Sequence, residues 1–332
     1  MSAEAGAAAA GFAEVLAAGG PELGGLLERT ETRLAAVARG HGATLGSHAG
    51  ATLAAGGKRL RPMLVFLCAG DRASDDLVGA AAAVELLHMA TLVHDDVLDR
   101  APLRRGRPTV FASDGRGAAT ATGDLLFSRA FAELVRGGSP DAVRDLSQAS
   151  SALARGELMQ REDAWSPDVG EERYLTRCGL KTGRLFEAAC RLGARLGDPG
   201  PPAAEALGDF GAGVGLAFQI FDDVLDVSGP AARTGKDRGT DLLDGTVTLP
   251  LILARRSDER LRALDLRAEV TTPGEAKCVC DHIAATGALE TARERALEHV
   301  AAAKASLEAA HLPDRPRKAL ELVADAVVAR YA

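Results

Sequence analysis

Runs of basic residues, paired cysteines and long apolar stretches are scarce or missing in this sequence. The net charge is −7 and the basic residues are scattered, which argues against a nucleic-acid partner. The five cysteines are odd in number and lack metal-site spacing, so we expect reduced thiols in a cytosolic protein. No apolar run approaches the roughly 20 residues that cross a bilayer. These absences predict a soluble, cytoplasmic protein with no transmembrane segment.

Strand signals are also lacking, so the fold is expected to be all-α. No change of composition marks a domain boundary. The sequence therefore predicts a low-complexity tail over residues 1–20, either frayed or docked as a short helix, and one all-α domain over 21–332. An amphipathic pattern predicts a helix over 22–47. The stretch 75–99 is apolar nearly all round, which is typical of a central buried helix.

One acidic pentapeptide, Asp-Asp-Val-Leu-Asp, occurs twice in apolar surroundings. If both copies are helical, the first and last Asp of each lie one turn apart on one face. Carboxylates among apolar neighbours need a counter-charge, and their hard oxygens suit Mg²⁺, which often shares its remaining sites with substrate phosphates. A solvated helix end would be the simpler interpretation of one copy, but two copies favour a metal site. The candidate ligands are Asp95, Asp96, Asp99, Asp222, Asp223 and Asp226.

Lysine is rare, with 6 residues against 33 arginines, and three of the six lie in short glycine-containing segments. In the segment 56–62, GGKRLRP, the glycines allow close approach of a ligand, and the following helix start favours an anion. An exposed basic loop is an equally good interpretation of that segment alone. Lys181, Thr182 and Gly183 interrupt a helical pattern, and a glycine there indicates a kink that would aim Lys181 and Thr182 into a cavity.

The two pentapeptides and the segment 56–62, in this order, resemble the trans-isoprenyl diphosphate synthases, also called the polyprenyl synthetase family. The resemblance runs from about residue 50 to the C-terminus. It implies an isoprenoid synthase helical bundle around a central substrate cavity. It also implies a homodimeric prenyltransferase that uses Mg²⁺ to condense isopentenyl diphosphate with an allylic diphosphate.

The resemblance also assigns substrate-binding roles to residues along the chain. Isopentenyl diphosphate would be held by Gly57, Lys58, Arg61, His88 and Arg105. The allylic substrate would be held by Arg104, Lys181 and Thr182. The remaining substrate-binding residues are Phe218, Gln219 and Lys236, the last in a polar lid loop. One departure stands out, because Thr246 replaces a lysine that many family members carry after that loop. One cation fewer is therefore expected near the site.

The implied chemistry is ionisation of a diphosphate beside a hydrocarbon. Mg²⁺ and cations would neutralise the leaving diphosphate, the double bond of isopentenyl diphosphate would attack the remaining carbocation, and apolar walls would exclude water. A terpene cyclase is a poor alternative, because its second metal motif differs and it has no use for the segment 56–62. A non-catalytic subunit of a heteromeric synthase would usually lose one pentapeptide. The implied catalytic residues are Asp95, Asp99, Lys181, Thr182, Gln219 and Asp222.

Product length should depend on residues just before the first pentapeptide, since the product grows along helix 75–99. Thr91 and Ala90 are small where farnesyl-making relatives tend to carry an aromatic ring, and Leu87 is of medium size. The missing plug predicts a product of geranylgeranyl length or longer, of the quinone side-chain type, with a short-chain synthase as the alternative. If Ala90 is small only because another helix packs on it, the cavity floor lies elsewhere.

Overall fold

The computed structural model describes residues 11, 13–54, 59–104, 106–229 and 238–329, and these form an almost entirely helical protein. The expected all-α fold is confirmed; β1 (Leu103–Arg104) and β2 (Arg107–Pro108) form a minimal antiparallel pair. The long helices are α2 (Glu22–Arg39), α3 (Ala43–Ala54), α5 (Asp75–Leu98), α6 (Val110–Arg136), α7 (Pro140–Asp163), α9 (Arg184–Leu196), α10 (Gly200–Ser228), α16 (Pro273–Ala285), α17 (Ala288–Ser306) and α18 (Asp314–Ala329). The shorter ones are α4 (Leu60–Cys68), α8 (Glu171–Cys178), α12 (Thr240–Leu243), α13 (Leu249–Ser257), α14 (Glu259–Ala263) and α15 (Leu266–Glu269).

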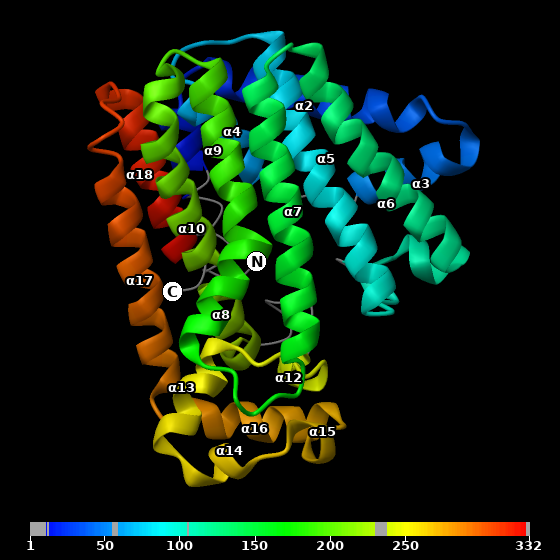
Figure 1. The fold of residues 1–332 in the computed structure, drawn as a ribbon, viewed down its shortest axis with the longest axis vertical. Helices are drawn as coiled ribbons and strands as arrows, with labels where there is room; N and C mark the ends of the chain where they lie inside the picture. Colours follow the sequence, from blue (N-terminus) through cyan, green and yellow to red (C-terminus); the bar gives the residue numbers. More distant parts are fainter. Residues whose placement is uncertain (1–10, 12, 55–58, 105, 230–237, 330–332) are drawn as a thin grey trace.

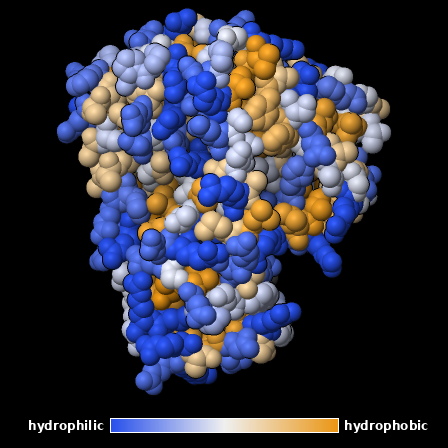
Figure 2. All heavy atoms as spheres, in the orientation of Figure 1, coloured by the Kyte–Doolittle hydropathy of each residue, from blue (hydrophilic) through white to orange (hydrophobic). Residues whose placement is uncertain are grey.

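Helices α7, α9, α10 and α17 run side by side, and α12 to α16 gather at one end of the bundle (Figure 1). Helix α5 packs chiefly on α6, while α10 packs on α9 and α17. One continuous apolar core joins these helices. Figure 2 shows a mainly hydrophilic face interrupted by apolar patches.

Helix α5, which carries the first pentapeptide, lies in the core, as its apolar sequence predicts. Ser74 caps it by accepting a hydrogen bond from the Leu77 amide at 3.2 Å, and Asp75 and Asp76 favour the positive helix start. Among the described residues this is the one helix long and apolar enough to cross a bilayer, yet 78% of that apolar window is buried inside the protein. We therefore interpret α5 as a core helix.

Two predictions for the N-terminal region need comment. The single helix expected over 22–47 is wrong, because the chain ends α2 at Arg39 and restarts at Ala43. Gly42 between them has φ of 81°, a left-handed conformation that breaks a helix and that glycine adopts without strain. In the expected tail, residues 13–18 are helical and Val15 is fully buried, so this described part is docked; residues 1–10 and 12 lie outside the described residues.

The kink predicted around Lys181 and Gly183 takes the form of a π-helical turn, η1 (Gly179–Gly183), between α8 and α9. Such turns widen a helix locally and often occur at functional sites. Helix α7 approaches this turn closely at Gly156, where a Cβ atom would lie 2.6 Å from the Lys181 amide nitrogen. Only a glycine allows that approach, which brings Glu157 of α7 next to Lys181.

Candidate active site

A polar cavity of about 270 Å³ lies where α5, α7, η1, α10 and α12 meet. Both Asp pentapeptides contribute to its lining, as do side chains from segments that carry no recognised motif. Carboxylates outnumber cations among the described lining residues. These charged residues are Asp95, Asp99, Asp222, Asp223, Asp241, Asp244, Arg104, Arg161, Arg177 and Lys181.

In the first pentapeptide, Asp95 and Asp99 line the polar cavity, whereas Asp96 does not. Asp99 accepts a hydrogen bond from Arg161 Nη2 at 2.6 Å. Asp96 is buried and accepts one from Arg104 Nε at 2.8 Å, in a small neighbouring pocket. The helical spacing thus gives two carboxylates to the cavity and turns the middle one toward an arginine.

In the second pentapeptide, Asp222 and Asp223 line the polar cavity. Asp223 is only 4% exposed and accepts two hydrogen bonds, from Tyr174 Oη at 2.6 Å and from Gln219 Nε2 at 2.8 Å. Asp226 is not in the lining; its side chain accepts a hydrogen bond from the Asp241 amide at 3.3 Å, which ties α10 to the start of α12.

Burial makes negative charge costly in this cavity. It raises the pKa of Asp95 to about 6 despite the opposing charge of Lys181. Burial, with Asp241 nearby, raises the pKa of Asp223 to about 8, although hydrogen bonds from Tyr174 and Gln219 act in the other direction. A positive group bound between the two pentapeptides would therefore be stabilised by neutralising them.

An apolar cavity of about 540 Å³ adjoins the polar one and shares Asp95, Lys181, Thr182 and Gln219 with it. Leu87 and Thr91 of α5, which were predicted to form the product-length wall, line it. Ala90 does not line it and is completely buried in the core. Arg61, His88 and Phe218, expected to bind substrate, are also in its lining.

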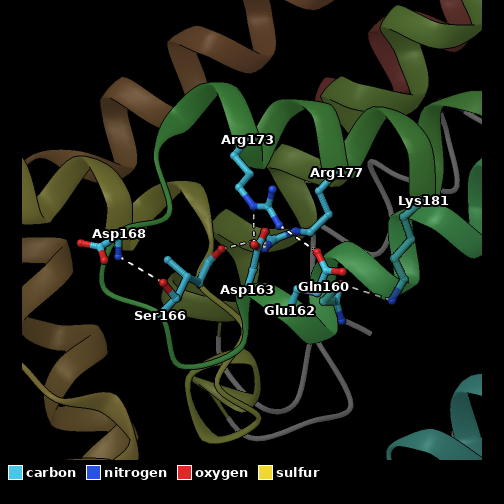
Figure 3. Close-up of polar contacts among 9 residues, drawn as sticks. Gln160, Glu162, Asp163, Ser166, Asp168, Arg173, Arg177 and Lys181 are labelled. Carbon is cyan, nitrogen blue, oxygen red and sulfur yellow. Dashed lines mark hydrogen bonds and ion pairs between the residues drawn. The ribbon is translucent and has the colours of Figure 1, made fainter.

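Three of the four shared residues, Lys181, Thr182 and Gln219, are held by side-chain hydrogen bonds at the boundary between the cavities. Lys181 Nζ donates to Glu157 Oε2 at 2.5 Å and to Gln160 Oε1 at 3.2 Å, the latter visible in Figure 3. Thr182 Oγ1 donates to Gln219 Oε1 at 2.8 Å. Burial lowers the pKa of Lys181, but Asp95 and Glu157 outweigh it and raise that pKa overall. The ammonium is therefore charged where the polar and apolar cavities meet.

Sequence reasoning missed several side chains at this site because they belong to no motif. Glu157, Gln160 and Arg161 come from α7, and Tyr174 and Arg177 come from α8. In Figure 3 the side chain of Arg177 points toward Asp163, which also pairs with Arg173. Arg177 additionally donates to the Val247 carbonyl at 2.7 Å. The sequence offered one signal for these residues: the spacing of Glu157, Gln160 and Arg161 places their three polar side chains on one face of a helix.

Four predicted substrate-binding residues lie outside the described residues: Gly57, Lys58, Arg105 and Lys236. The predicted residue Arg61 is described, and its guanidinium stacks over the Phe186 ring at 4.5 Å from the ring centre. Thr246, the residue that departs from the family pattern, is in the polar lining. The cations described at this cavity are accordingly those of α7, α8, η1 and β1.

The donor set can be tested against a divalent metal. In the described part of the chain no three His, Cys, Asp or Glu side chains cluster closely enough to hold an ion alone. Asp95, Asp99 and Asp222 nevertheless face one cavity from two helices and offer hard oxygens. That arrangement fits Mg²⁺, which is usually bound by one or two carboxylates with waters and substrate phosphates completing its shell.

Comparison with known proteins agrees with the fold. Residues 43–281 match the polyprenyl synthetase family model. The chain is 44% identical over 221 residues to heptaprenyl diphosphate synthase component 2 of Geobacillus stearothermophilus, covering 66% of this chain and 69% of that one. It is 37% identical over 283 residues to octaprenyl diphosphate synthase of Escherichia coli K12, covering 83% and 86%.

Among solved structures, the polyprenyl synthase from Caulobacter crescentus, in complex with calcium and isoprenyl diphosphate, superposes with a TM-score of 0.84. It is 35% identical and covers 94% of this chain and 95% of its own. The protein therefore belongs to the polyprenyl synthetase family, the trans-isoprenyl diphosphate synthases. It has the helical fold of that family and is a prenyltransferase.

Proposed function

We propose that the protein is a Mg²⁺-dependent all-trans polyprenyl diphosphate synthase that condenses isopentenyl diphosphate with an allylic diphosphate. The observation that carries the proposal is the pairing of a carboxylate-lined polar cavity with an apolar cavity, sharing Asp95, Lys181, Thr182 and Gln219. A diphosphate ester of a long hydrocarbon likewise has a charged part, which fits the polar cavity, and an apolar part, which fits the apolar cavity. Its reacting carbon would lie at the shared boundary.

The residues on either side of the boundary have distinct roles in this reaction. Lys181 and Arg104 bind the allylic diphosphate, and Mg²⁺ held by Asp95, Asp99 and Asp222 would neutralise the charge that develops on it. As the carbon–oxygen bond breaks, the oxygens of Thr182 and Gln219, fixed by their hydrogen bond, face the cationic carbon. The double bond of isopentenyl diphosphate forms the new carbon–carbon bond, and a proton leaves to the released diphosphate.

The apolar cavity then serves two purposes. It excludes water, which would otherwise quench the carbocation, and it receives the growing hydrocarbon. Its wall at Leu87 and Thr91 carries no aromatic plug on α5. That supports a long product, as do the relatives named heptaprenyl and octaprenyl diphosphate synthases.

We propose a homodimer as the working form, in the cytoplasm. Apolar side chains are exposed on three successive helices. Leu98 of α5 is 51% exposed and Phe127 of α6 38%, and both also line the apolar cavity, while Leu158 of α7 is 63% exposed. A second copy would cover them. One relative is named component 2 of a synthase, so the purified chain should be studied without any partner protein. Light scattering gives its mass, and the elongation assay described below gives its activity. A dimer that is active by itself supports the proposal, and a monomer that is inactive contradicts it.

The decisive experiment is incubation of the pure protein with labelled isopentenyl diphosphate and, in turn, geranyl, farnesyl and geranylgeranyl diphosphates. We expect Mg²⁺-dependent products of geranylgeranyl length or longer, resolved by chromatography after dephosphorylation. Absence of any elongated product with all three primers, in the presence of Mg²⁺, would contradict the proposed function.

A further inference from the structure

Two cations that line the polar cavity, Arg161 and Arg177, belong to no sequence motif. Four cationic side chains line it among the described residues. Arg104 and Lys181 have the substrate roles proposed above, and Arg177 is buried and tied to Asp163 and the Val247 carbonyl. The fourth is Arg161. Its side chain is 42% exposed, against 3% for Arg177 and 29% each for Arg104 and Lys181, so it has the most freedom to change partners.

The present partners of Arg161 are the second reason to single it out. Its Nη2 donates to Asp99 Oδ1 at 2.6 Å, and its Nε donates to Glu157 Oε1 at 2.8 Å. Asp99 is a candidate metal ligand, and one carboxylate oxygen cannot serve a guanidinium and a divalent cation equally well. When Asp99 takes up another cation, the Nη atoms of Arg161 need a new acceptor, while Nε stays anchored on Glu157.

A diphosphate is the acceptor that this geometry suits. A guanidinium is permanently charged, and its planar fork matches phosphate oxygens. Glu157 also holds Lys181 Nζ at 2.5 Å, so one carboxylate places both cations on the same side of the polar cavity. Thr246 lines that cavity without a charge, so besides Arg104 and Lys181 the described lining offers only Arg161 and the buried Arg177 to a diphosphate.

Building on the function proposed above, we infer that Arg161 is a binding residue for the diphosphate of the allylic substrate. It pairs with Asp99 in the empty site and turns to the diphosphate when the site is filled. It supplies the positive charge that Thr246 does not.

The test compares Arg161→Leu with Arg173→Leu as a matched control. Arg173 is 45% exposed, also pairs with two carboxylates, Glu162 and Asp163, and is outside the cavity lining. With saturating Mg²⁺, Arg161→Leu should raise the KM for farnesyl diphosphate roughly ten- to a hundredfold, the loss expected for charge-assisted hydrogen bonds. The KM for isopentenyl diphosphate should change less than about twofold, and Arg173→Leu should change neither.

Two further variants distinguish direct binding of the diphosphate by Arg161 from an indirect effect of the substitution on folding. Arg161→Lys should recover part of the lost affinity, and Thr246→Lys introduced into Arg161→Leu should recover part of it from a different position. Calorimetry with inorganic pyrophosphate and Mg²⁺ gives a readout independent of turnover, and Arg161→Leu should weaken the Kd about as much as it raises the KM for farnesyl diphosphate. Unchanged pyrophosphate affinity, or equal increases in both KM values, would overturn the inference.

These results are also distinguishable from failure of the proposed function. If the unmodified protein elongates no primer, the synthase proposal is wrong. The pyrophosphate arm still tests Arg161 in that case, because it requires only the cavity and the ligand.

Discussion

The two copies of the pentapeptide lie near the ends of α5 and α10, yet different groups compensate the negative charge of their carboxylates. The first copy, on α5, is met by cations: Arg161 pairs with Asp99, and Arg104 pairs with Asp96. In the second copy, on α10, Asp223 is met by neutral donors, since Tyr174 and Gln219 both donate to it. An identical sequence therefore specifies where the carboxylates lie but not what compensates their charge.

The correspondence extends to the residues before each copy. Thr91 and Phe218 each lie four residues ahead of the first Asp, and both line the apolar cavity. Ala90 and Ala217 each lie five residues ahead, and both are completely buried in the core. The two helices thus present equivalent faces to the cavity, but α5 offers a small side chain where α10 offers an aromatic ring.

The largest expected effect tests what the two copies share. Asp95→Ala and Asp222→Ala should each reduce turnover by about a hundredfold or more, because each removes a major electrostatic stabiliser of the leaving diphosphate. Steady-state rates with and without excess chelator measure this. Full activity of either variant, or of the unmodified protein in chelator, would show that the copies do not form one metal-dependent site.

The next effect concerns the unequal wall of the apolar cavity. Thr91→Phe should give α5 the ring that α10 already has and shorten the main product. Ala90→Phe should instead overpack the core and lower the free energy of unfolding by about 1–3 kcal/mol, because it meets neighbouring helices. Product chromatography and urea denaturation measure the two outcomes. A stable Ala90→Phe protein with shorter products would place Ala90, rather than Thr91, on the wall.

A smaller effect separates cationic from neutral compensation. In metal-free protein, Tyr174→Phe should cost about 1–3 kcal/mol, since a buried carboxylate loses a donor, and the cost should not depend on salt. Arg161→Leu should cost about 0–1 kcal/mol, because its pair with Asp99 is exposed, and that cost should vanish in concentrated KCl. Denaturation at low and high KCl checks both, and equal salt dependence would remove the distinction between the copies.

A further effect is a dependence of stability on pH. In metal-free protein the pKa values of Asp95 and Asp223 are raised to about 6 and about 8, so the folded chain retains protons that the unfolded chain has released above about pH 4. The free energy of unfolding should therefore fall as pH rises, up to about pH 8. Asp223→Asn should flatten the part of the slope above about pH 6, and an unchanged slope there would contradict the assignment.

The sequence was sufficient for features carried by local patterns. Two pentapeptides in apolar helices predicted the acidic cavity, and a glycine in a helical stretch predicted the irregular turn at Lys181. Residues 22–47 were wrongly joined because glycine in a helix only weakens it, and the positive φ of Gly42 cannot be read from composition. Helix α5 is apolar on nearly every face, so its pattern could not show that Thr91 and Leu87 face the cavity while Ala90 faces the core.

The partners of the carboxylates could not be predicted for a related reason. Arg161, Glu157 and Tyr174 reach the site through packing of α7 and α8 across α5 and α10, far away in the chain. Amphipathic patterns place such helices only approximately, whereas a hydrogen bond depends on fractions of an ångström. Gly156 illustrates this: its importance becomes visible only where the backbone of η1 lies against it.

The π-helical turn η1 also has a consequence for how this chain tolerates insertions and deletions. A π turn contains one residue more than an α turn spanning the same rise, so the residues on either side of it are out of phase by about 100° relative to an unbroken helix. Deleting Leu180, which precedes Lys181 in this turn, would restore a regular helix from α8 to α9. It would also rotate Tyr174 and Lys181 relative to one another about the helix axis, so that Asp223 and Glu157 could no longer both be reached from this segment. The length of this turn is therefore a determinant of the site in its own right, separate from the identity of any side chain in it.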